Sequence, residues 1–215
     1  MACLLLPAGA LGDRLSRKGT LLFGLAVMAG ASVWSATAHT PLVLILARGA
    51  AGIGAAFVFP STLSTLTAIS TGERKGRAVA IWSACTALGG IVGLIGSGAL
   101  LQHHPWPWIF WATGGLAGVT LLLAAIIAVD TRDPQHAHLD PVGTMLSVIG
   151  VGGVVLGITE GPVRGWTDRL TLVGLVAGGV GILAFIVWEA YTDRPLLDVR
   201  LFKQAQLGMS ALAVL

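Results

Sequence analysis

Few residues of this chain combine a chemically active side chain with a spacing that could support a reaction. The two cysteines, Cys3 and Cys85, lie in apolar stretches and are interpreted as packing residues. The five histidines are scattered over predicted loops without the spacing of metal ligands. We find no paired carboxylates, nucleophile–base set or phosphate-binding glycine loop, so the sequence predicts neither an enzyme nor a metal or cofactor site.

Two charged features remain as candidates. The segment 9–18 holds one carboxylate among three cations: Asp13, Arg14, Arg17 and Lys18. Such a cluster at a helix terminus can hold one conformation and release it in another, or it can simply anchor the chain at a membrane surface. The second feature is Arg48, a cation inside an apolar stretch. A charge there usually faces a cavity or a partner, and the alternative is that its side chain snorkels to the interface.

The elements that must position these residues are predicted to be membrane-spanning helices. The 215 residues are 55% hydrophobic and only 11% charged, whereas soluble domains carry about 25% charged residues. Six stretches approach or exceed the roughly 20 apolar residues that a span requires: 19–38, 41–69, 76–101, 108–129, 142–160 and 170–191. Shorter apolar runs at both ends predict partial helices, so we expect the chain to be a fragment. The predicted fold is an all-α integral membrane bundle.

The distribution of basic residues predicts the orientation of the helices. Ten of the 13 basic residues fall in alternate loops, and the intervening loops hold only Arg164 and Arg169. By the positive-inside rule, the basic loops are cytoplasmic: 12–18, 71–77, 130–140 and 192–206. The same spread over loop ends argues against a nucleic-acid-binding patch. We therefore predict a multi-pass protein of the plasma membrane.

Small residues predict where helices approach closely. In the stretch 76–101, Cys85, Gly89, Gly93 and Ser97 recur at every fourth position and share one face, and Gly98 belongs to an adjacent row. In the stretch 41–69, Ala47, Ala51 and Ala55 do the same, ahead of Pro60. Small residues at this spacing let two helix backbones come together in a bilayer.

The segment 9–18 also resembles a family signature. Gly-x-Leu-x-Asp-Arg-x-Gly-Arg-Lys joins the second and third helices of the major facilitator superfamily, and six residues match it: Gly9, Leu11, Asp13, Arg14, Arg17 and Lys18. Ser16 stands where that family usually has glycine. The resemblance implies that this turn gates the conformational change of a transporter.

Further segments resemble the same superfamily in the same order. Residues 48–56 are similar to its fourth-helix motif, with Ala51 in the place of glutamine. Residues 93–98, followed by 106–110, are similar to its fifth-helix antiporter motif, with Leu94 in the place of proline. Segments 159–166 and 195–202 resemble the fourteen-helix drug:proton antiporters, which insert two extra helices between their six-helix halves. The antiporter motif implies a role for Gly89, Gly93 and Gly98, and the fourth-helix motif implies proton coupling through Arg48.

This resemblance implies a domain organisation and a function. Residues 1–129 would form a first transporter half without its first helix, 130–193 the two extra helices, and 194–215 a cytoplasmic linker with the start of the second half. The function implied is proton-driven efflux of small hydrophobic or cationic drugs, with the proton gradient as energy source and no cofactor. The truncated chain is expected to be inactive alone, and its expected partners are the lipid bilayer, the missing half or a second copy. Two alternatives stay open: a non-transporting fragment that modulates a full-length transporter, and a transporter of another small molecule.

Overall fold

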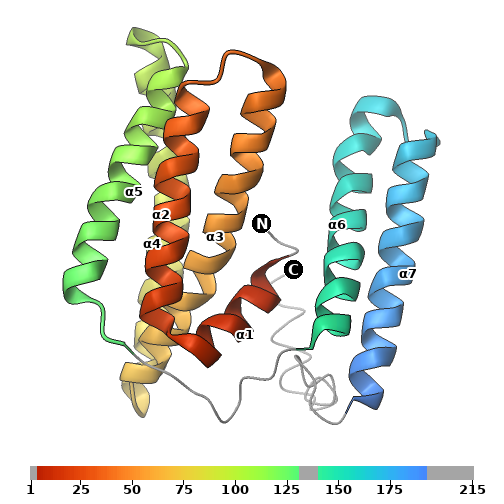
Figure 1. Cartoon of the computed structure of the whole chain (residues 1–215), viewed down its shortest axis with the longest axis horizontal. Coiled ribbons are helices and arrows are strands. Elements are labelled where there is room, and N and C mark those ends of the chain that lie inside the picture. Colours follow the sequence, from red (N-terminus) through yellow and green to blue (C-terminus); the bar gives the residue numbers. More distant parts are fainter. Residues whose placement is uncertain (1–3, 131–139, 193–215) are drawn as a thin grey trace. The chain divides into compact units, whose positions relative to one another are not determined.

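The computed structural model describes residues 4–130 and 140–192, apart from the side chains of Leu6, Asp13, Arg14, Leu15 and Glu73. All regular elements in these two ranges are helices (Figure 1). In chain order they are α1 (Leu5–Leu15), α2 (Arg17–Ala36), α3 (Pro41–Ile69), α4 (Glu73–His103), α5 (Pro107–Ile127), α6 (Pro141–Arg164) and α7 (Arg169–Tyr191).

The predicted all-α membrane bundle is confirmed. Six helices of the described chain, α2 to α7, are long and apolar enough to cross a membrane. Each coincides with a predicted span to within a few residues. The boundaries follow from local capping: Ser16 accepts a hydrogen bond from the backbone N–H of Gly19 and begins α2, and Asp168 caps α7 through the N–H of Leu170. Helix α1, with 11 residues, is too short to span.

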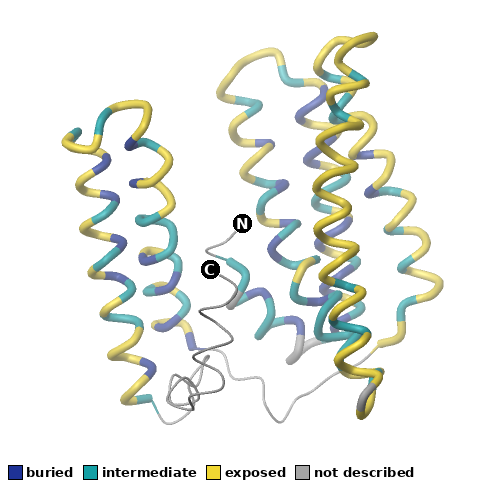
Figure 2. Tube along the Cα trace, turned by 180° about the vertical axis from the view of Figure 1, so that it is seen from behind, coloured by how far each residue is buried: buried dark blue, intermediate teal, exposed yellow. Residues whose placement is uncertain are grey.

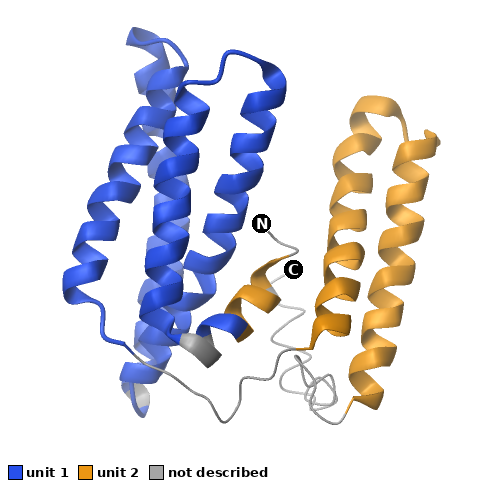
Figure 3. Ribbon diagram, viewed as in Figure 1, with its two compact units in different colours: residues 1, 11–137 blue, residues 2–10, 138–215 orange. Residues whose placement is uncertain are grey.

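The described residues separate into two compact units (Figure 3). In the first unit, α2 packs against both α3 and α5, whereas α4 makes only sparse contacts with α3 and α5. Helices α2 and α3 meet at a pair of glycines. A Cβ atom added to Gly24 would lie 2.8 Å from the carbonyl oxygen of Gly54, so neither position has room for a side chain. The predicted packing residues Ala47 and Ala51 of α3 are buried as well.

The second unit is an antiparallel pair, α6 and α7, held together along two rows of glycine. Gly150 meets Gly181, Gly153 meets Gly178, and Gly157 meets Leu175. A Cβ atom on Gly153 would lie 2.7 Å from the Cα atom of Gly178. Helices this close gain van der Waals contact along their whole length, which is the main attraction between helices in lipid.

Most large apolar residues of the described chain are exposed, and Figure 2 shows exposed positions along the helices of both units. Ile126 is 81% exposed and Val163 is 82% exposed. In water such a surface would be unstable, but against lipid chains it needs no cover. Buried positions are mainly small or weakly polar residues, which is the reverse of a soluble core.

Parts of the predicted organisation lie outside the described residues. These are most of the loop 130–140, the loop 192–206, the linker and partial helix at 194–215, and the segment 195–202. The division at 129 and 193 therefore stays a prediction.

Candidate functional site

The segment 9–18 forms the junction between α1 and α2. Helix α1 ends at Leu15, and α2 begins at Arg17, so the predicted polar turn is reduced to Ser16. The side chains of Asp13 and Arg14 lie outside the described part. Arg17 is buried, and Lys18 is half-buried. The cluster is thus more tightly packed than a solvated anchor would be.

Ser16 links this junction to a residue of the same unit that lies far away in the sequence. Its Oγ atom accepts the N–H of Gly19 at 2.8 Å and donates to Oδ1 of Asp130 at 2.6 Å. Asp130 follows α5, so one hydroxyl group both caps α2 and joins its start to the end of α5. Glycine, the residue usual at this position in the resembling motif, could do neither.

A small cavity lies beside the junction. It has a volume of about 350 Å³ and is lined by Leu11, Ser16, Gly19, Thr20, Phe23 and Phe57. The rings of Phe23 and Phe57 meet edge to face, with centroids 5.3 Å apart. The Thr20 hydroxyl donates to the carbonyl oxygen of Ser16. Because both lining hydroxyl groups are already hydrogen-bonded, the cavity suits an apolar group.

Arg48 lies on α3, seven residues from its start at Pro41. The residue is exposed, and its guanidinium carbon lies 5.3 Å from the centroid of the Phe110 ring on α5. That distance falls within the range of a cation–π interaction. The cation thus rests on an aromatic face near the ends of α3 and α5 where these helices begin.

The glycine row of α4 has no partner within the described chain. No atom of the described residues comes within 4 Å of a Cβ added to Gly89, Gly93 or Gly98. The close packing predicted for this face is therefore not formed by the described part. Instead, Gly93 and Ser97 line a groove of about 530 Å³ between α4 and α5, opposite Thr113 and Leu116. The hydroxyl groups of Ser97 and Thr113 bond to carbonyl oxygens of their own helices, so the groove offers an apolar wall.

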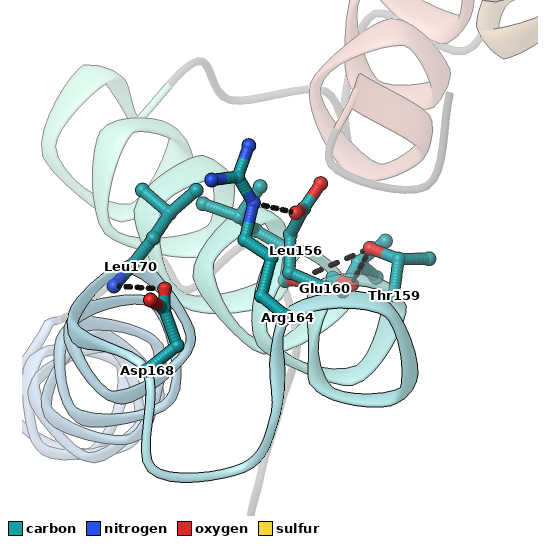
Figure 4. A network of polar contacts seen from close by, with 7 residues as sticks. Leu156, Thr159, Glu160, Arg164, Asp168 and Leu170 are labelled. Atoms are coloured by element: carbon teal, nitrogen blue, oxygen red, sulfur yellow. Dashed lines mark hydrogen bonds and ion pairs between the residues drawn. The ribbon is translucent and has the colours of Figure 1, made fainter.

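A motif of the second unit, residues 159–166, covers the end of α6 and the start of the turn that leads to α7 (Figure 4). Glu160 pairs with Arg164 one helical turn away at 2.5 Å. Gly165, with φ of 99°, terminates α6 in a conformation that favours glycine. The ring of Trp166 lies against Gly161, where a Cβ atom would be 2.7 Å from it. These contacts give the residues of the motif a structural role at the end of α6, with an ion pair at the surface.

Sequence reasoning missed several buried polar groups. Ser61 and Thr65, one turn apart on α3, have buried hydroxyl groups with no hydrogen-bond partner among the described residues. The hydroxyl group of Thr171 on α7 is also buried without such a partner. Glu189, near the end of α7, is only 3% exposed. Near it, Oδ2 of Asp140 accepts the indole N–H of Trp188 at 2.6 Å. A polar residue in an apolar stretch was the available signal, but only packing shows which face it occupies.

The comparison with known families decides the identity. A model described as Major Facilitator Superfamily matches residues 1–215. The chain belongs to the Major Facilitator Superfamily. The predicted family membership is thereby confirmed, and with it the prediction of a multi-pass membrane protein.

Several relatives in the superfamily are named as drug exporters. The chain is 34% identical over 217 residues to the multidrug efflux pump LfrA of Mycolicibacterium smegmatis, covering 99% of this chain and 42% of the pump. It is 29% identical over 211 residues to the multidrug resistance protein Stp of Mycobacterium tuberculosis, covering 98% and 39%. It is 33% identical over 213 residues to the MFS-type transporter Rv1250 of the same species, covering 98% and 36%. The chain thus spans about two fifths of the length of these relatives, and the bacterial relatives agree with a plasma-membrane location.

Proposed function

We propose that this chain is part of a proton-driven exporter of small hydrophobic or cationic compounds. The observation that carries the proposal is Arg48, a cation within an apolar span of a chain similar to multidrug efflux proteins. A charge within an apolar span is costly, so the presence of Arg48 there favours a role in moving ions or substrates. We expect no enzymatic chemistry, because transport requires binding and conformational change alone.

In this proposal, two features have separate roles. Arg48 interacts with the proton pathway, and the α1–α2 junction with Asp13, Arg14, Arg17 and Lys18 holds one conformation of the transporter and releases it in another. The burial of Arg17 and the hydrogen bonds of Ser16 support a specific junction rather than a loose anchor. The energy source is the proton gradient.

We also propose that the 215-residue chain does not transport by itself. Alternating access requires two bundles that rock around a central site, and the chain matches only 36% to 42% of the three relatives compared. The partner would be a second bundle, supplied by further chain or by another copy. The uncovered glycine row of α4 supports this view, because small residues at such spacing usually meet another helix.

The same uncovered face favours a second candidate function. A chain without transport activity could bind a full-length transporter through α4 and modulate it. Gly93→Leu would then abolish co-purification with the transporter. The same substitution would leave the stability of the isolated chain unchanged, because no neighbouring atom of the described part lies near Gly93. Transport of another small molecule is the remaining alternative, and a substrate panel would separate it from drug export.

Reconstitution tests the proposal. The chain alone, and a chimera in which it replaces the matching part of LfrA, would be placed in liposomes with an imposed proton gradient and a fluorescent cationic drug. We expect gradient-dependent drug movement only with the chimera, and loss of that movement in Arg48→Ala. Arg164→Ala, which removes an arginine from the α6–α7 turn, is the matched control and should retain transport. Drug movement by the chain alone that requires Arg48 would contradict the claim that it is inactive.

A further inference from the structure

Arg48 and Phe110 join two helices that do not otherwise pack. Helices α3 and α5 both pack against α2, but they share no backbone proximity with each other. The side chain of Arg48 crosses this gap, and its guanidinium carbon lies 5.3 Å from the Phe110 ring centroid. The contact is therefore made by the side chains and not by close approach of the two backbones.

The geometry of the two helices explains why the side chains meet. Both helices begin at the same side of the unit, and Figure 1 shows their first turns at the same end. Arg48 lies seven residues into α3, and Phe110 lies three residues into α5. A helical side chain leans toward the start of its own helix. Arg48 therefore lies about one helical turn, or about 5 Å, deeper than Phe110. Because its side chain leans toward the start of α3, its guanidinium group reaches the level of the Phe110 ring.

The Phe110 ring is itself held in place. It is half-buried, and the ring of Trp106 meets it nearly at a right angle, at 79°, with the centroids 5.9 Å apart. Trp106, in contrast, is 46% exposed. The ring that faces the cation is therefore fixed by its neighbour, while the outer aromatic residue is free to contact the interface.

We propose that Phe110 is a positioning residue for Arg48. Its ring holds the guanidinium group within the span by a cation–π interaction. Without the ring, the Arg48 side chain would extend to the aqueous interface. The functional consequence rests on the proposed proton coupling through Arg48, whereas the positioning itself is a property of the chain alone. The negative face of the ring supplies the attraction, so its electron density, and not only its volume, matters.

The chemical reactivity of Arg48 tests the positioning directly. The purified 215-residue chain in lipid nanodiscs would be treated with phenylglyoxal, and modification of Arg48 would be followed by mass spectrometry of its peptide. A cation–π contact of about 0.5–1 kcal/mol corresponds to a roughly two- to five-fold change in equilibrium. We expect Arg48 to react about two- to five-fold faster in Phe110→Leu and no faster than the parent in Phe110→Trp.

Two further variants separate attraction from shielding. Replacement of Phe110 by trifluorophenylalanine keeps its shape but removes the negative face, and it should accelerate the reaction as much as leucine does. Phe23→Leu is the matched control, because it disturbs a ring pair that does not touch Arg48, and it should leave the rate unchanged. Acceleration by leucine but not by the fluorinated ring would overturn the cation–π interaction, as would equal rates in all variants.

Transport by the LfrA chimera gives an independent readout. If Arg48 couples to protons, Phe110→Leu should shift the pH dependence of drug transport, and Phe110→Trp should restore it. A chimera without proton-driven transport would defeat the proposed function but not the positioning, which the reactivity measurement decides alone. Unchanged reactivity with an altered pH profile would reject Phe110 as the positioning residue.

Discussion

The hydroxyl group of Ser16 donates a hydrogen bond of 2.6 Å to Asp130, 114 residues later in the chain. The same oxygen accepts the N–H of Gly19 at the start of α2. One small side chain thus ties the α1–α2 junction, which carries the candidate gating cluster, to the end of α5.

Substitutions at Ser16 should separate its two bonds. Loss of a serine cap to alanine costs about 0.5–2 kcal/mol, whereas glycine costs only a few tenths. We therefore expect Ser16→Ala to lower the free energy of unfolding by about 1 kcal/mol or more, and Ser16→Gly by less. Urea unfolding in detergent would measure both. In a double-mutant cycle, Asp130→Ala should add little to Ser16→Ala, and full additivity would show that the two residues are not coupled.

Two adjacent glycines of α7 provide a matched test of helix packing. A Cβ atom on Gly178 would collide with the backbone nitrogen of Val154, whereas nothing lies within 4 Å of one on Gly179. Gly178→Ala should destabilise the α6–α7 pair by about 1–3 kcal/mol or more, because the colliding atoms are backbone. Gly179→Ala should be neutral or slightly stabilising, since alanine favours the helix by about 1 kcal/mol. Thermal unfolding of both variants in detergent decides it, and equal effects would rule out the glycine contact.

Two acidic residues should differ in their effect on transport. In the LfrA chimera, Asp13→Asn should impair drug efflux strongly, because Asp13 belongs to the charged cluster proposed to hold one conformation. Glu73→Gln should have little effect, because Glu73 begins α4 beside an exposed loop. Initial efflux rates at matched expression are the measurement. Equal rates for the two variants would remove the special role of Asp13.

The predicted orientation can be checked by labelling single cysteines. With Cys3 and Cys85 replaced by alanine, cysteine would be introduced at Lys75 or at His104, which are both exposed. Because basic loops stay in the cytoplasm, a membrane-impermeant maleimide should label position 104 in intact cells. Position 75 should react only after the cells are permeabilised. Rapid labelling of position 75 from outside would invert the proposed topology.

The sequence by itself determined the class of the protein and the extent of its helices. Composition forces the chain into lipid, and within lipid every backbone group must bond inside its own helix, so apolar length alone predicts the spans. The residues 9–18 and the order of the later motifs likewise predicted the family. These inferences needed only local information.

Only the tertiary structure decided which small residues bring helices together. Gly93 and Gly178 both lie in glycine-rich helices. A Cβ atom on Gly93 would have no neighbouring atom within 4 Å in the described chain, whereas one on Gly178 would collide with the backbone of Val154. Periodicity places residues on a face but does not say which helix meets that face. The same reason hid the links from Ser16 to Asp130 and from Arg48 to Phe110. Both contacts join elements far apart in sequence. The first depends on the packing of α5 against α2, and the second depends on the packing of both α3 and α5 against α2.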